Sequence, residues 1–286
     1  MTDSGAPDRR RARLEVLGAA VLFSTGGAAI KGTALTAWQV AGVRSLVAAL
    51  ALLVLLPAAR RHWRPRSVAV GAFYAATLIL FVLANKLTTA ANAIYLQAVG
   101  PLVVMVLAPL VLAEHVRRQD VPFVVAMAGG LALVFAGQQQ PIATAPNPFA
   151  GNLAGAASGL TWGFTIVGLR WMGSRDQDAI LNCVVIGNLI AAAVCLPVIW
   201  PIHASVHDWL TLLWLGIFQI GMAYALLTRG VRHVTALDAS LLLLAEPVLN
   251  PVWAWMIHGE RPTSWALAGG AVILSASVAR TMMARD

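Results

Sequence analysis

Two charged side chains, Glu246 and Arg44, lie within long runs of apolar residues. Glu246 follows four leucines in LLLLAEPVLNPVWAW, residues 241–255, and Arg44 lies in AWQVAGVRSLVAAL, residues 37–50. In an apolar setting a carboxylate could pair with a substrate ammonium or take up a proton. A guanidinium could hold a substrate carboxylate through two parallel hydrogen bonds. Either group could instead form a structural ion pair between helices, and the sequence leaves that choice open.

Prolines interrupt the apolar run that holds the carboxylate and one earlier apolar run. Pro247 and Pro251 remove two backbone donors from the run, and Pro101 and Pro109 do the same in an earlier apolar run. A proline inside a helix kinks or breaks it. Interrupted backbone at membrane depth is tolerated only against protein or a water-filled cavity. We therefore expect helix breaks or gating elements at these four prolines, with ordinary proline enrichment as the alternative.

Further polar and aromatic side chains lie in other apolar runs and are candidate substrate contacts. Tyr74, Thr77 and Phe81 are spaced for one face of a helix. The remaining candidates are Gln97, Trp162, Gln219 and Asn250. Amides and hydroxyls in such positions could contact a substrate, or could only join helices at about 0.6 kcal/mol each.

The composition of the chain indicates whether these residues lie in water or in a membrane. Hydrophobic residues make up 59% of the 286 residues and charged residues 11%, against about 25% charged in soluble chains. The net charge of +8 comes from short basic clusters between apolar runs, which argues against a nucleic-acid-binding face. The chain is expected to be an all-α integral membrane protein.

Ten apolar runs are long enough to cross a bilayer as helices, which takes roughly 20 residues each. The expected spans are 14–31, 36–57, 67–85, 91–112, 121–138, 151–170, 179–200, 209–228, 237–257 and 264–281. Sixteen of the 20 lysines and arginines lie before the first expected span or at or beyond the end of an even-numbered span, which places them on one side of the membrane. Because positive residues favour the cytoplasm, both termini are expected there.

The chain repeats itself at a separation of about 140 residues, an estimate from aligned stretches. AIYLQAVGPLVVMVLAPLVLAE at 93–114 aligns with ASLLLLAEPVLNPVWAWMIHGE at 239–260, so Pro101 falls on Pro247. GAAVLFSTG at 18–26 resembles GAASGLTWG at 155–163. Five spans per copy is an odd number, so the copies are expected to have inverted topology, as in many secondary transporters. The expected units are a first repeat at 1–137, a linker at 138–150 and a second repeat at 151–286.

With its duplicated five-span unit, its paired prolines and the motifs LAEHV and HGERP after the aligned runs, the sequence resembles the drug/metabolite transporter superfamily and its EamA repeat family. Within it, the chain most resembles bacterial amino acid exporters of the YddG type. It departs from the pattern after Glu114, where about six extra residues precede the glycine pair. The resemblance implies an inner-membrane carrier of bacteria that exports metabolites.

The function expected from these observations is secondary active or facilitative export of amino acids, aromatic ones among them, by alternating access. The alternative is a carrier for a cationic drug, a sugar phosphate or a nucleotide derivative. No GxxxxGK[ST], HExxH, CxxC or GxSxG motif occurs, so no ATPase motor, enzyme activity, metal or cofactor is expected. The expected partners are a small-molecule substrate and the lipid bilayer, and the sequence does not decide between a monomer and a homodimer.

Overall fold

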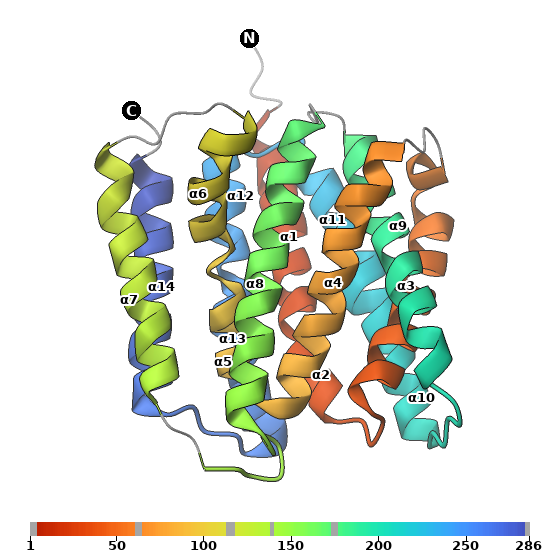
Figure 1. Ribbon diagram of the computed structural model, residues 1–286. Coiled ribbons are helices and arrows are strands. Elements are labelled where there is room, and N and C mark those ends of the chain that lie inside the picture. Colours follow the sequence, from red (N-terminus) through yellow and green to blue (C-terminus); the bar gives the residue numbers. More distant parts are fainter. Residues whose placement is uncertain (1–4, 61–64, 113–117, 138–139, 173–176, 284–286) are drawn as a thin grey trace.

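The computed structural model consists of helices that run roughly parallel or antiparallel to one another (Figure 1). It describes residues 5–60, 65–112, 118–137, 140–172 and 177–283. The first half contains α1 (Gly5–Ser24), α2 (Gly26–Lys31), α3 (Ala37–Leu55), α4 (Pro65–Leu87), α5 (Ala90–Gln97), α6 (Gly100–Leu112) and α7 (Val121–Ala136). The second half contains α8 (Pro148–Trp171), α9 (Gln177–Cys195), α10 (Val206–Leu213), the π-helix η4 (Trp214–Met222), α11 (Ala223–Gly230), α12 (Ala236–Leu243), α13 (Ala245–His258) and α14 (Ser264–Met283). Short 3-10 helices lie at η1 (Pro57–Arg60), η2 (Arg118–Asp120) and η3 (Leu196–Val198).

These helices form the ten expected spans, because five spans consist of consecutive helical pieces: α1–α2, α5–α6, α9–η3, α10–η4–α11 and α12–α13. Eight spans are long and apolar enough to cross a bilayer, and α7 is a shorter apolar helix. The remaining span, α8, has 24 residues and runs beside the others (Figure 1). α1 starts at the end of the bundle where both termini lie, and α8 starts at the other end. We call these the terminal end and the opposite end. The inverted arrangement of the two halves is thereby confirmed.

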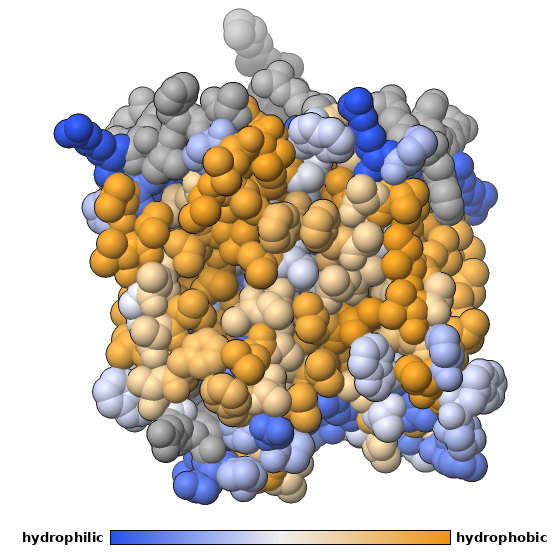
Figure 2. Space-filling view, viewed as in Figure 1, coloured by the Kyte–Doolittle hydropathy of each residue, from blue (hydrophilic) through white to orange (hydrophobic). Residues whose placement is uncertain are grey.

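The surface agrees with a membrane protein. On the face shown in Figure 2, apolar side chains form a broad band across the middle, and hydrophilic side chains lie at both ends. Leu50, Val54, Leu110 and Leu153 are among the large apolar side chains that are at least half exposed. In water such a surface would be a large interaction patch, whereas in a bilayer the lipid chains cover it.

The aligned prolines coincide with breaks in two spans. α5 ends at Gln97 and α6 begins at Gly100, and α12 ends at Leu243 and α13 begins at Ala245. In a continuous helix residue 101 would donate to the carbonyl of Gln97 and residue 247 to that of Leu243, but proline has no N–H. The breaks therefore occupy equivalent positions in the two repeats.

The other two prolines do not interrupt their helices. Pro109 lies inside α6 and Pro251 inside α13, and both helices continue past them. A break that the proline pattern did not indicate separates α1 from α2 at Thr25. Glu114, the equivalent of Glu260, lies outside the described residues.

Glycines bring the helices into close contact. A Cβ built on Gly159 would lie 2.6 Å from the carbonyl oxygen of Leu96, and one on Gly163 would lie 2.5 Å from Val103 Cβ. α8 therefore packs backbone against backbone on the broken span α5–α6. A Cβ on Gly100 would lie 2.8 Å from Trp162 Cδ1, so the indole of Trp162 fills the space that this glycine leaves.

Candidate functional site

A cavity of about 390 Å³ lies between the two repeats. Its lining residues are Phe23, Arg44, Tyr74, Thr77, Leu78, Phe81, Gln97, Trp162, Thr165, Leu169, Ile180, Cys183, Val184, Gln219, Ile220, Tyr224, Leu227, Leu243 and Glu246. Eight of the nine candidate substrate contacts are in this set. Three lining residues lie near the terminal end of the bundle. Leu169 is close to the last residue of α8, Ile180 to the first residue of α9 and Leu227 to the last residue of α11. The cavity therefore extends from the middle of the bundle toward the terminal end.

Arg44 enters the cavity wall from α3. It lies seven residues beyond Ala37, where α3 begins, or about 10 Å along the helix at 1.5 Å per residue. The side chain is 1% exposed, and its Nε and Nη1 atoms have no hydrogen-bond partner among the described residues. A buried cation with unused donors needs an anionic partner, and a substrate carboxylate in the adjoining cavity would supply one.

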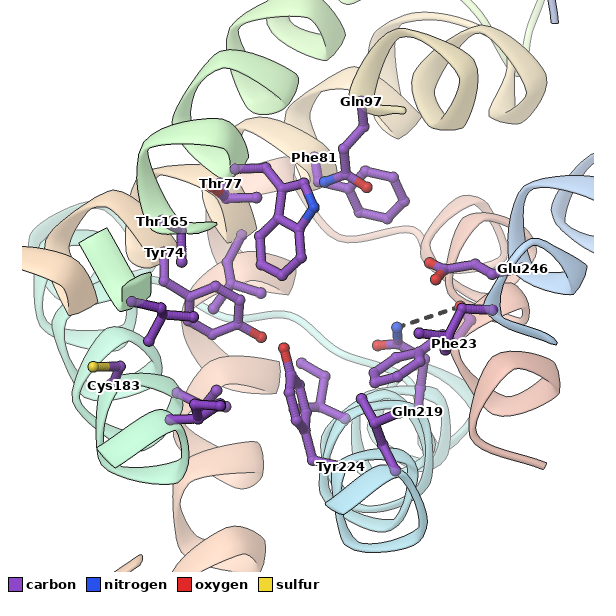
Figure 3. Close-up of a pocket in the computed structure, with 18 of the residues that line it drawn as sticks. Phe23, Tyr74, Thr77, Phe81, Gln97, Thr165, Cys183, Gln219, Tyr224 and Glu246 are labelled. Atoms are coloured by element: carbon purple, nitrogen blue, oxygen red, sulfur yellow. Dashed lines mark hydrogen bonds between the residues drawn. The ribbon is translucent and has the colours of Figure 1, made fainter. Parts of the chain in front are cut away.

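Glu246 lies in the first turn of α13, immediately after the break in its span. Its carboxylate points toward the open centre of the cavity (Figure 3). Ion pairs between described side chains include Arg11–Glu15, Arg13–Asp238, Lys31–Glu260 and Arg280–Asp120. Neither Glu246 nor Arg44 takes part in one, so within the described part of the chain the structural ion pair considered for them is not formed.

Aromatic side chains line the same cavity as these two charges. The rings of Tyr74 and Tyr224 meet edge to face at 6.4 Å between centroids, and their hydroxyl groups point toward each other (Figure 3). Phe23 packs on Tyr224 at 5.2 Å, and Trp162 lies 6.2 Å from Tyr74. Such rings can bind a flat apolar group and can also face a cation.

Polar groups of the wall are held in place by neighbouring helices. Gln97 Nε2 donates to Ser158 Oγ at 2.9 Å, and Gln219 Nε2 donates to the carbonyl oxygen of Phe23 at 3.4 Å. The Gln219 Oε1 atom has no partner among the described residues. Gln219 lies in the π-helix η4, and π-helical segments often occur at functional sites. The Thr77 hydroxyl bonds Phe73 and Thr161, so helix packing uses it already.

Asn250 is the one candidate substrate contact that does not line the cavity. Its amide is fully buried and packs directly against Gly27 of α2, next to Asn85 of α4. It lies one turn beyond Glu246 on α13, about 6 Å nearer the opposite end, where α13 packs on α2. The structure thus places Asn250 in helix packing.

Several lining residues were not among the candidates. Phe23 and Tyr224 are aromatic residues in apolar runs, and Leu243 aligns with Gln97 in the repeat, so a pairing of the two copies could have found it. Leu78, Ile180 and Val184 carry no such signal, because an aliphatic side chain on a cavity wall looks like one that faces lipid.

Comparisons with known proteins agree with this architecture. The sequence profile of the EamA-like transporter family matches residues 12–136 and 149–280. The pseudopaline exporter CntI of Pseudomonas aeruginosa is 24% identical over 91% of this chain and 92% of its own length. The aromatic amino acid exporter YddG of Ancylobacter novellus is 25% identical over 88% of each chain. An uncharacterized protein of Pseudomonas aeruginosa is 30% identical over 94% of this chain and 96% of its own.

A solved crystal structure covers 96% of this chain and 97% of its own, with a TM-score of 0.64 at 19% identity, so it supports the fold alone. The family match covers both repeats and nearly all ten spans. The fold, the inverted repeat and this match agree with one another: the chain belongs to the EamA-like transporter family.

Proposed function

We propose that this chain exports amino acids, with aromatic ones among its substrates, through the central cavity by alternating access. The observation that carries the proposal is the placement of one cation and one carboxylate, unpaired with each other, on the same cavity wall. Arg44 would hold the substrate carboxylate and Glu246 its ammonium group. The aromatic wall of Phe23, Tyr74 and Tyr224 would contact the side chain.

The same set of residues argues against the other substrate classes. A phosphate of a sugar phosphate or nucleotide carries about two negative charges, and Arg44 is the only lysine or arginine among the described residues that line the cavity. A cationic drug would face the unpaired charge of Arg44. A zwitterion satisfies both charged groups at once, and the relatives named as exporters of aromatic amino acids or pseudopaline support this choice.

We further propose that the terminal end faces the cytoplasm of a bacterial inner membrane. Positively charged residues gather on the cytoplasmic side of multi-pass proteins, and Arg9, Arg10, Arg60, Arg66 and Arg229 lie in segments at the terminal end. The cavity then faces the cytoplasm, where a substrate for export would enter. Transport would be driven by the substrate gradient or by coupling to protons.

Counterflow into sealed proteoliposomes tests the proposed substrate class. Vesicles preloaded with phenylalanine are expected to take up labelled phenylalanine and tryptophan, with and without a pH gradient. The panel includes lysine, a sugar phosphate, a nucleotide sugar and a quaternary ammonium drug. Uptake of a nucleotide sugar without uptake of any amino acid would overturn the proposal.

The Glu246→Gln variant is expected to lose affinity for amino acids without losing affinity for molecules that lack an ammonium group. A hydrogen bond to a charged group contributes about 1.5–3 kcal/mol, or about 10- to 150-fold in affinity. The measurement is inhibition of phenylalanine counterflow by unlabelled phenylalanine and by 3-phenylpropionate. The parent should prefer phenylalanine by about this factor, and the variant should bind the two almost equally.

Glu15→Gln serves as the matched control for this variant. Glu15 is a carboxylate of α1 that pairs with Arg11 near the terminal end, outside the cavity. Its replacement is expected to leave the preference unchanged. If Glu246→Gln keeps the parental preference, Glu246 does not bind the ammonium group.

A further inference from the structure

The end of the bundle opposite to the termini contains a buried ion pair between the two repeats. Lys31 is the last residue of α2, and Glu260 follows α13. Lys31 Nζ lies 3.1 Å from Glu260 Oε2, and the two side chains are 2% and 1% exposed. This pair is far better shielded from water than two other pairs that join the two halves, Arg13–Asp238 and Arg280–Asp120, whose arginine side chains are 58% and 40% exposed.

Backbone groups from two further segments complete the site. Lys31 Nζ donates to the carbonyl oxygens of Thr88 at 2.7 Å and Thr144 at 2.5 Å. Glu260 Oε1 accepts a hydrogen bond from the backbone N–H of Ala90, the first residue of α5, at 2.6 Å. The pair therefore joins α2, the α4–α5 connection, the linker between the repeats and the α13–α14 connection.

The local structure of the chain directs Glu260 into this position. Gly259 has φ of 66°, a left-handed conformation that favours glycine and ends α13. The chain then turns, and the backbone N–H of Glu260 bonds back to Ala254 of α13 at 3.4 Å. A second contact at this end, between His258 Nε2 and the carbonyl oxygen of Ala28 at 2.8 Å, also joins α13 to α2.

The charged side chains that face the pair from neighbouring elements already form hydrogen bonds with other groups. Lys86 of α4 donates to the carbonyl and hydroxyl oxygens of Thr33 at 2.7 and 2.9 Å. Asp208 of α10 accepts from the backbone of Ala34 and Ser205. Lys31 and Glu260 are thus each other's charged partner among the described residues.

We propose that Lys31 and Glu260 form the gate of the opposite end, and that the pair must separate before substrate can leave there. The inference rests on the proposed alternating access but not on the identity of the substrate. Burying an ion pair costs hydration that the mutual attraction only partly returns. Separation loses the attraction and regains the hydration, so the open and closed gate can be close in free energy.

The short helix α5 connects this gate to the cavity. Its first residue, Ala90, donates to Glu260, and its last residue, Gln97, lines the cavity. The two residues are about 10 Å apart along one rigid helix. A shift of Gln97 on substrate binding would move Ala90 relative to Glu260 and weaken the gate.

Cysteine accessibility in sealed vesicles of known orientation tests the gate without any substrate. Both native cysteines are replaced by alanine, and Phe81→Cys reports on the half of the cavity nearer the opposite end. A membrane-impermeant methanethiosulfonate is added on the side of the opposite end. Lys31→Met or Glu260→Gln leaves one buried charge without a partner, so each is expected to increase the labelling rate about tenfold or more.

Two comparisons separate a gate from a structural contact. The double variant Lys31→Met with Glu260→Gln has no lone charge, so its labelling rate should fall back toward that of the parent. A second reporter, Leu227→Cys, lies near the terminal end. When the reagent is added on the side of the terminal end, its labelling rate should be lower in the single variants than in the parent. Arg13→Met, in the exposed pair at the terminal end, is the matched control and should change neither rate.

Single variants that are folded and label at the parental rate would overturn the gate. Glu260→Asp keeps the charge, but its shorter side chain cannot reach Ala90 and Lys31 together. This variant replaces the neutral variants in the experiment if those fail to fold. It should label faster than the parent, and a parental rate would also count against the gate. Because labelling needs no substrate, failure of amino acid counterflow would reject the proposed substrate and leave this result standing.

Discussion

Replacing Arg44 by methionine is expected to weaken amino acid export strongly and at the same time to make the empty carrier more stable. The two effects have opposite signs because the structure gives this arginine no partner within the described part of the protein. A residue that served only to hold helices together would show loss of both properties.

The loss of transport follows from the unused donors of Arg44. A substrate carboxylate would take two charge-assisted bonds from the guanidinium, and removing them should lower affinity by about 100-fold or more. Discrimination should change in a specific way. Phenylalanine and phenylethylamine, which lacks the carboxylate, should inhibit counterflow by the variant about equally.

The expected gain in stability follows from the burial of the Arg44 charge. Arg44 is 1% exposed and no anion neutralises it among the described residues. A charged side chain at mid-membrane costs about 2.5–3.5 kcal/mol on insertion scales. Methionine has a similar unbranched stem without the charge, so the gain is expected to be on the order of 1–3 kcal/mol.

Thermal unfolding of the purified carrier in detergent measures this gain. Arg280→Met is the control, because that arginine is 40% exposed and pairs with Asp120, and its replacement should change little. A lower unfolding temperature for Arg44→Met would show that Arg44 supports the fold.

The second large effect is expected from two neighbouring glycines of α7. Gly130→Ala should destabilise the protein strongly, whereas Gly129→Ala should be neutral or slightly stabilising. A Cβ on Gly130 would lie 2.7 Å from Ile273 Cγ1 and 2.8 Å from the carbonyl oxygen of Gly269, both in α14. A Cβ on Gly129 would have no atom of another group within 4 Å.

The physical cause is the distance between α7 and α14. The backbone of Gly269 cannot move aside as a flexible side chain could, so the two helices must separate, at a cost of about 1–3 kcal/mol. At Gly129 the alanine faces open space and gains about 0.5–1 kcal/mol from helix propensity. Unfolding temperatures of the two variants should therefore lie on opposite sides of the parent, and equal values would contradict the packing.

The fold was largely predictable because its signals are local. Apolar runs of bilayer length, prolines at aligned positions and the side preference of arginine each act within one span or loop. Pro101 and Pro247 therefore mark breaks that the structure contains. The π-helix η4 and the break at Thr25 have no comparable local signal.

The site was predictable only in part. Charged or aromatic residues in apolar runs, such as Arg44 and Trp162, stand out in the sequence. Asn250 stands out equally, yet it lies one turn further along α13, where the close approach of Gly27 of α2 makes it a packing contact. The Lys31–Glu260 pair could not be predicted, because each residue lies near a span end where an exposed charge is common, and only tertiary packing buries them together.

The contact between Trp162 and Gly100 has a consequence for the resting state of the carrier. In an inverted repeat, the second facing state arises when the two copies exchange conformations. Thr25 occupies the place of Trp162 in the other copy, and Glu246 occupies that of Gly100. The indole can therefore fill such a space in one copy only. The two facing states then cannot have equal free energy, and the unloaded carrier should spend most of its time facing one side of the membrane.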